Sequence, residues 1–173
     1  MTASVLIPDL SGVFESEGPI LNITTTIGSL TMANNSTFAT DGGARGFTLT
    51  GQFFLQDLGT PADFAFAGSG SLTVGGTVDN DGILRWSSTG AAQFGNTFTN
   101  DGTFRIENGA NAGNVTISGT ATNNGTWDLA DGANPDYDGT LRIAGSWTNG
   151  ATATFLSGTV STVAFGNIAG SGA

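Results

Sequence analysis

The chain lacks the residues on which the commonest catalytic and metal sites depend. Its 173 residues include no cysteine and no histidine. Disulfides are therefore excluded as a source of stability. The usual zinc sites are excluded as well, and so is the activation of a nucleophile by histidine. No hydrophobic run approaches the length needed to cross a membrane, and the first nine residues show neither a basic segment nor a signal-peptide core.

Charge is also scarce, and most of it is negative. Four basic and 14 acidic residues give a net charge of −10, and only 10% of all residues are charged. A surface of this kind repels the phosphates of nucleic acids and of anionic lipids, so we expect neither nucleic acid nor a membrane as a partner. Low charge combined with many Phe, Val, Ile and Leu residues argues against a disordered chain.

A ten-residue unit occurs four times in the second half of the chain. The copy at 97–106 reads Thr-Phe-Thr-Asn-Asp-Gly-Thr-Phe-Arg-Ile, and the copies at 77–86, 120–129 and 146–155 align with it without a gap. The asparagines of successive copies are 20, 23 and 26 residues apart, which is typical of a repeat architecture.

Hydrophobic residues occupy three columns of this alignment. Residues two apart on a strand share a face, so these columns are predicted to point inward. Within a coil, a small residue in one column accompanies a large one in another, as close packing requires. The columns are Val78, Phe98, Ala121 and Trp147; Leu84, Phe104, Trp127 and Ala153; and Trp86, Ile106, Leu129 and Phe155.

The asparagine column predicts a structural ladder. Asn80, Asn100, Asn123 and Asn149 each precede Gly, Asp-Gly or Asn-Gly, which are residues suited to a sharp corner. Asparagines stacked in successive coils can also hydrogen-bond to one another along the axis, as in amide ladders. We favour this structural role over a binding role.

A third short strand precedes the glycines at 51, 76, 119 and 145, which gives three strands per coil. The predicted fold is therefore all-β: a parallel β-helix, or β-solenoid, of roughly seven coils. We assign the solenoid to residues 20–173. Residues 1–19 do not fit the repeat, contain two prolines and are predicted to form an irregular N-terminal arm or cap.

Segments such as 97–104 and 114–119, Asn-Val-Thr-Ile-Ser-Gly, resemble the coils of right-handed parallel β-helices. Similar coils occur in autotransporter passengers and haemagglutinin-type adhesins of bacteria, and trimeric β-helical phage structural proteins share the architecture. The resemblance implies an architecture more than a function, because the repeat contains no catalytic signature. It favours a structural or attachment role without a cofactor.

Two groups of acidic residues raise the possibility of a metal site. Asp131, Asn134, Asp136 and Asp138 offer oxygen ligands for calcium within one predicted loop. Their spacing matches neither an EF-hand nor the calcium-binding β-roll, so a solvated turn is the preferred interpretation. Asp81 and Asp101 are predicted to stack in successive coils, which costs stability unless the carboxylates splay into water.

Two other functions are less favoured. The outward-facing threonines around the asparagine column resemble the ice-contacting faces of some solenoids, but coils of unequal length argue against ice binding. Two carboxylates on a β-helix can cleave polysaccharides, but the acids here lie mostly at corners and in loops. We therefore expect no enzymatic activity.

The preferred prediction is a structural or attachment protein on the surface of a virion. It would be a decoration, cement or fibre protein that docks on a capsid or tail through the N-terminal arm and forms a homo-oligomer, with a trimer favoured. An initial Met without an export signal, the acidic arm and solenoid ends that require covering all favour this prediction. The alternative is a fragment of an autotransporter-type adhesin, located outside the cell or on the bacterial surface.

Overall fold

The computed structural model describes residues 5–7, 13–16, 25–40, 46–107, 113–129, 140–156 and 162–168, and this part of the chain folds into strands and turns without helices. Side chains are described for residues 26–40, 46–107, 113–129 and 140–156. No helix long and apolar enough to cross a membrane is found among the described residues.

The strands are short and follow one another in sets of three. They are β1 (Val5–Ile7), β2 (Val13–Ser16), β3 (Thr25–Ile27), β4 (Leu30–Met32), β5 (Thr37–Thr40), β6 (Phe47–Leu49), β7 (Phe53–Leu55), β8 (Asp63–Gly68), β9 (Leu72–Val74), β10 (Val78–Asn80), β11 (Ile83–Ser88), β12 (Ala92–Phe94), β13 (Phe98–Asn100), β14 (Thr103–Ile106), β15 (Val115–Ile117), β16 (Ala121–Asn123), β17 (Thr126–Asp128), β18 (Thr140–Asn149), β19 (Thr154–Leu156) and β20 (Thr162–Ile168).

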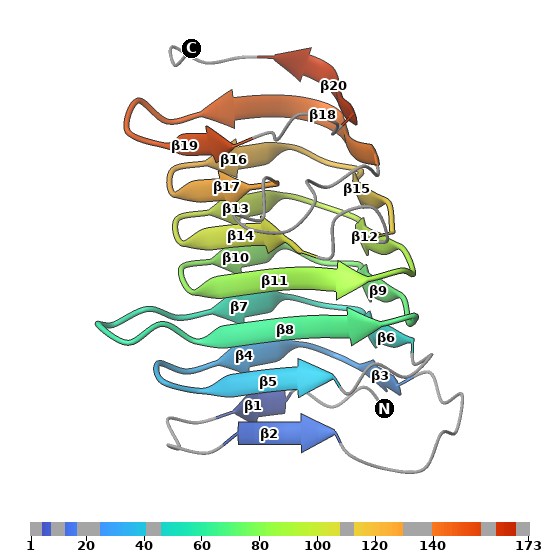
Figure 1. Ribbon diagram of the computed structural model, residues 1–173, viewed down its shortest axis with the longest axis vertical. Helices are drawn as coiled ribbons and strands as arrows, with labels where there is room; N and C mark the ends of the chain where they lie inside the picture. Colours follow the sequence, from blue (N-terminus) through green and yellow to red (C-terminus); the bar gives the residue numbers. More distant parts are fainter. Residues whose placement is uncertain are drawn as a thin grey trace.

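Each set of three strands forms one coil with three faces, and every strand pairs in parallel with its counterparts in the neighbouring coils (Figure 1). The first face runs β1-β4-β7-β10-β13-β16-β18, the second β2-β5-β8-β11-β14-β17-β19, and the third β3-β6-β9-β12-β15-β18. The first and third faces join into one 13-stranded sheet because β18 continues around a corner and pairs with both β15 and β16. The predicted parallel β-solenoid with three strands per coil is thus confirmed.

The strands of five coils, from β4 to the first half of β18, have described side chains. Further strands extend the stack at both ends. At the N-terminal end, β1 pairs with β4 and β2 pairs with β5, so part of the predicted arm continues the first two faces. The other residues of 1–24 lie outside the described residues, and a domain boundary after residue 19 stays a prediction.

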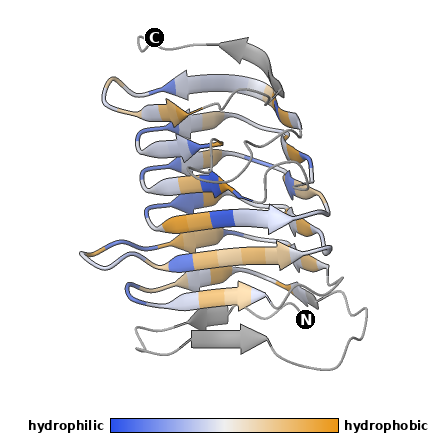
Figure 2. Cartoon of the chain, viewed as in Figure 1, coloured by the Kyte–Doolittle hydropathy of each residue, from blue (hydrophilic) through white to orange (hydrophobic). Residues whose placement is uncertain are grey.

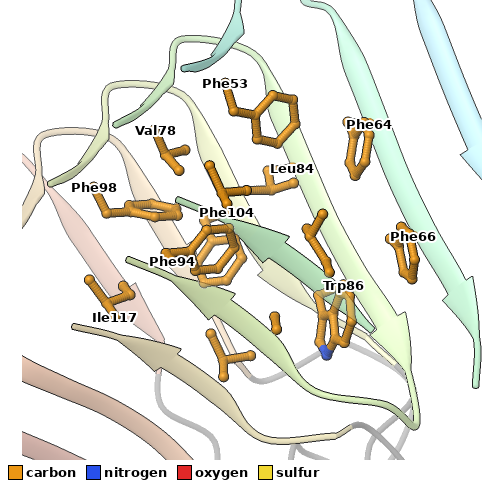
Figure 3. Close-up of a cluster of buried hydrophobic side chains, with 14 of the residues drawn as sticks. Phe53, Phe64, Phe66, Val78, Leu84, Trp86, Phe94, Phe98, Phe104 and Ile117 are labelled. Atoms are coloured by element: carbon orange, nitrogen blue, oxygen red, sulfur yellow. The ribbon is translucent and has the colours of Figure 1, made fainter. Parts of the chain in front are cut away.

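The interior consists of the predicted hydrophobic columns. Val78, Phe98, Ala121 and Trp147 are in register on the first face and are at most 5% exposed. Rings from different faces meet between them: Phe98 packs on Phe104 (Figure 3), with ring centroids 5.2 Å apart. Burial of each large side chain contributes about 1.5–3 kcal/mol, so the core is the main source of stability. Hydrophilic residues gather at the corners that join the first face to the second (Figure 2).

The last coil departs from the ungapped alignment. Phe155, and not Ala153, pairs with Trp127, so the prediction that Ala153 lies in this inward column is wrong. Two extra residues in the corner after Asn149 cause the shift, and the N–H of Ala153 closes the turn on the carbonyl of Gly150 at 3.1 Å. The physical reason is packing, because an aromatic ring at this position fills the space beside Trp127 and Trp147, at centroid distances of 6.2 and 5.8 Å.

Candidate functional site

The corner between the first and second faces contains a ladder of four asparagines. The side-chain N–H group of Asn80 donates to Oδ1 of Asn100 at 2.6 Å. Asn100 donates in the same way to Asn123, and Asn123 to Asn149, both at 2.8 Å. Asn80, Asn100 and Asn123 are fully buried. The stacked amides therefore form one continuous hydrogen-bonded row along the solenoid axis.

The same side chains also satisfy backbone groups of the corner. Nδ2 of Asn100 donates to the carbonyl of Thr126 at 3.0 Å, and Nδ2 of Asn80 donates to that of Thr103, also at 3.0 Å. The row begins at Asn80 because Leu55 occupies its position in the coil below. As a result, the buried Oδ1 of Asn80 has no hydrogen-bond partner among the described residues.

Three carboxylates lie together on the outer side of this corner. Oxygens of Asp79, Asp81 and Asp101 lie within 4.8 Å of one another, and we call these three residues the acidic corner. Asp79 and Asp81 flank the inward-facing Asn80, and Asp101 follows Asn100 one coil further along. Asp101 also accepts a hydrogen bond from the side chain of Asn124 at 2.8 Å.

The crowding of like charges affects how readily these groups ionise. Loss of surrounding water raises the pKa of Asp79, and the Asp101 carboxylate raises it further. The pKa of Asp81 is raised first by loss of water and then by Asp79, Asp101 and Asp57. Both groups hold a proton more firmly than an isolated aspartate does, so ionisation of the acidic corner at neutral pH opposes folding.

Carboxylate oxygens at this separation are ligands of the kind that hard cations such as Ca²⁺ prefer. The repeat predicts Asp81 and Asp101 as a stacked pair, whereas Asp79 falls in the same outward row as the threonines beside the asparagine column. A local signal for Asp79 was available, because the residues on either side of an inward-facing residue both point outward. Asp79 and Asp81, which flank Asn80, therefore share the outer surface. Exposed acidic groups are nevertheless common without an ion, and these carboxylates do not by themselves define a metal site.

Comparisons with protein-family models, curated proteins and solved structures find no match to this chain. Its function has to be inferred from its own geometry.

The other predicted sites are distributed elsewhere. Asp131, Asn134, Asp136 and Asp138, the weak calcium candidate, lie outside the described residues. The threonine row on the first face consists of Thr99, Thr122 and Thr148, in register. Below them the same outward column contains Asp79 and then Phe54, so the row is interrupted in the lower coils.

The second face carries two arginines in directly paired positions, Arg85 and Arg105. Each is compensated by an aspartate: Arg85 forms an ion pair with Asp63, and Nε of Arg105 donates to Asp128 at 3.0 Å. The hydrogen bonds that Arg85 donates to the Asp63 carboxylate raise the pKa of Arg85. These ion pairs are local to the second face, so they leave the charge of the acidic corner unbalanced.

The corner between β7 and β8 was not predicted to differ from the others. Residues 56–62 separate β7 from β8, whereas only Asp81 and Gly82 separate β10 from β11. This longer segment projects at the same side of the solenoid as the acidic corner (Figure 1). It places Leu58 in solvent, with 81% of its surface exposed. A leucine within a Gly- and Pro-containing stretch was the available sequence signal.

Proposed function

We propose that this protein is a non-enzymatic structural and attachment protein. The observation that carries the proposal is the parallel stack, in which hydrophobic columns link each coil to the next and a buried amide ladder joins the four coils from Asn80 to Asn149. Such an interior gives a stiff rod, because each coil is held by the coils on both sides. The carboxylates of the acidic corner, which lie close to one another, are on the outer side of the solenoid. This position suits display on a surface better than chemistry in a cleft.

The first candidate setting is the surface of a virion, where the chain would act as a decoration, cement or fibre protein, with a trimer as the favoured assembly. What supports it is an ordered lateral projection, the β7–β8 corner, with which a short rod can dock on a protein lattice. The second candidate is a bacterial surface adhesin of the autotransporter type. It is favoured by the parallel pairing of β16 with β18 and of β18 with β20, which continues the stack into the last described coils as a longer stalk would.

Localisation tests the proposal and separates the two settings. Antibodies raised against the purified protein would be used for immunogold labelling of virus particles and of sectioned cells from the source. Regular labelling of particles supports the virion role, and labelling of the cell envelope supports the adhesin. Label confined to the cell interior contradicts both. Light scattering of the purified protein adds the assembly state, for which the virion role predicts a trimer.

A further inference from the structure

The β7–β8 corner, residues 56–62, which we call the Leu58 loop, is built to hold one conformation. Oδ1 of Asn34, in the coil below, accepts hydrogen bonds from the N–H groups of Leu58 and Thr60, both at 3.1 Å. The N–H of Asn35 donates to the carbonyl of Thr60 at 2.8 Å. Oδ1 of Asp57 accepts from the N–H of Gly59 at 2.8 Å, and Gly59 adopts a φ of 114°, which favours glycine.

Despite this order, the loop does not bury its largest apolar side chain. Leu58 is 81% exposed, and the only other large hydrophobic residue exposed among the described side chains is Leu156, at 44%. Hydrogen bonds that fix the backbone while a leucine points into water do not serve the core of this chain. They do serve binding, because a loop that is already ordered loses little conformational freedom when it docks.

The charge around the loop specifies the partner. Asp57 lies within the loop and close enough to Asp81 to disfavour ionisation of that carboxylate. The acidic corner continues the negative surface from there, while Arg85 and Arg105 on the adjoining second face are engaged by acids of that face. At this surface the acidic corner of a second copy would be repelled, whereas a basic surface would be attracted.

We propose that the Leu58 loop is a docking knob for a basic protein partner: Leu58 enters an apolar pocket, and Asp57 and the acidic corner face lysine or arginine side chains around it. The inference rests on the attachment role proposed above and names the surface that performs it. An anchor residue surrounded by a charged rim is the usual anatomy of a protein interface.

Three synthetic peptides test the chemistry of the partner. One alternates leucine with lysine, one replaces every lysine with glutamate, and one replaces every leucine with serine. We expect the Lys–Leu peptide to bind about tenfold more tightly than either control, since it alone supplies both features. Its affinity should fall as salt is added, because exposed charges are screened. Hydrogen exchange should show protection at residues 56–62. Failure of the Lys–Leu peptide to bind contradicts the proposal.

Variants of the intact chain then locate the site. Leu58→Ser should weaken binding of the Lys–Leu peptide about tenfold and leave the Lys–Ser peptide unaffected. Asp57→Asn should weaken both lysine peptides and flatten the salt dependence. Leu156→Ser, the matched exposed leucine at the end of the solenoid, should change nothing.

Equal effects of the Leu58 and Leu156 variants, or protection elsewhere, would overturn the assignment. So would a dimer that Leu58→Ser dissolves. Such failures leave the attachment role standing if particles or envelopes are labelled, whereas label confined to the cell interior contradicts the role whatever the peptides do.

Discussion

Replacing one rung of the asparagine ladder should cost far more in its middle than at its lower end. In Asn100→Leu, Oδ1 of Asn123 loses its donor and becomes a second buried acceptor without a partner, in addition to that of Asn80. In Asn80→Leu, the unpartnered acceptor simply moves from Asn80 to Asn100, so their number is unchanged. The Leu55 of the coil below is a native precedent for leucine at this position.

The magnitudes follow from these counts. An orphaned buried acceptor costs about 1–3 kcal/mol, and each lost hydrogen bond about 0.5–1.5 kcal/mol. Asn100→Leu loses the bonds with Asn80 and Asn123 and those with the carbonyls of Gly102 and Thr126, and a leucine recovers part of the loss by hydrophobic burial. We expect a net loss of about 3 kcal/mol for Asn100→Leu, and a change within about 1 kcal/mol for Asn80→Leu.

Thermal unfolding followed by circular dichroism and tryptophan fluorescence measures both variants. A loss of about 3 kcal/mol corresponds to a fall in Tm of about 6–12 °C for a chain of this length. Asn80→Leu should remain within about 4 °C of the parent protein. Equal Tm values for the two variants would refute the reasoning, because they would mean that unpartnered amide groups do not determine the stability of this corner.

Other outcomes follow from the same structure. Asp79→Thr should stabilise the chain by about 0.5 kcal/mol at pH 7 by removing a like-charge contact. The gain should vanish below pH 3.8, the ordinary pKa of an aspartate, because Asp79 is then protonated in both the folded and the unfolded chain. Since the pKa of Asp79 is raised in the folded state, its ionisation destabilises the fold only as the pH rises above 3.8. Urea midpoints of variant and parent that differ equally at pH 3 and pH 7 would contradict this. Phe155→Ala should cost about 2–4 kcal/mol by leaving a cavity beside two tryptophans, whereas Ala153→Ser, in the turn, should cost less than about 0.5 kcal/mol; equal falls in Tm for the two variants would contradict the shifted register of the last coil. Gly102→Ala should cost about 1–3 kcal/mol, because a Cβ there would collide with the carbonyl of Gly82; an unchanged Tm would mean that the stacked corners are looser than described.

Some parts of the fold and of the candidate site could be predicted from the sequence and others could not, for physical reasons. The columns headed by Val78 and Leu84 were predictable because alternation along a strand fixes which side chains point inward. The asparagine corners were predictable because stacked amides bond to one another and because Gly102 has no room for a Cβ beside Gly82. The shift at Phe155 was not, since whether a corner holds two residues or four depends on which side chain fills the neighbouring coil. The same limit applies to Asp79, which meets Asp101 only when two coils stack.

The sequence by itself determined the coil. The repeat period, the inward columns and the corner asparagines can be predicted from the order of the residues, because they are local properties of strands and turns. The tertiary structure alone decided what lies on the outside of the stack. Which carboxylates converge, which loop is held by an asparagine of the coil below and which leucine stays in water all depend on contacts between residues about 20 or more positions apart. Those contacts are set by the registry of one coil on the next, and no single coil contains that information.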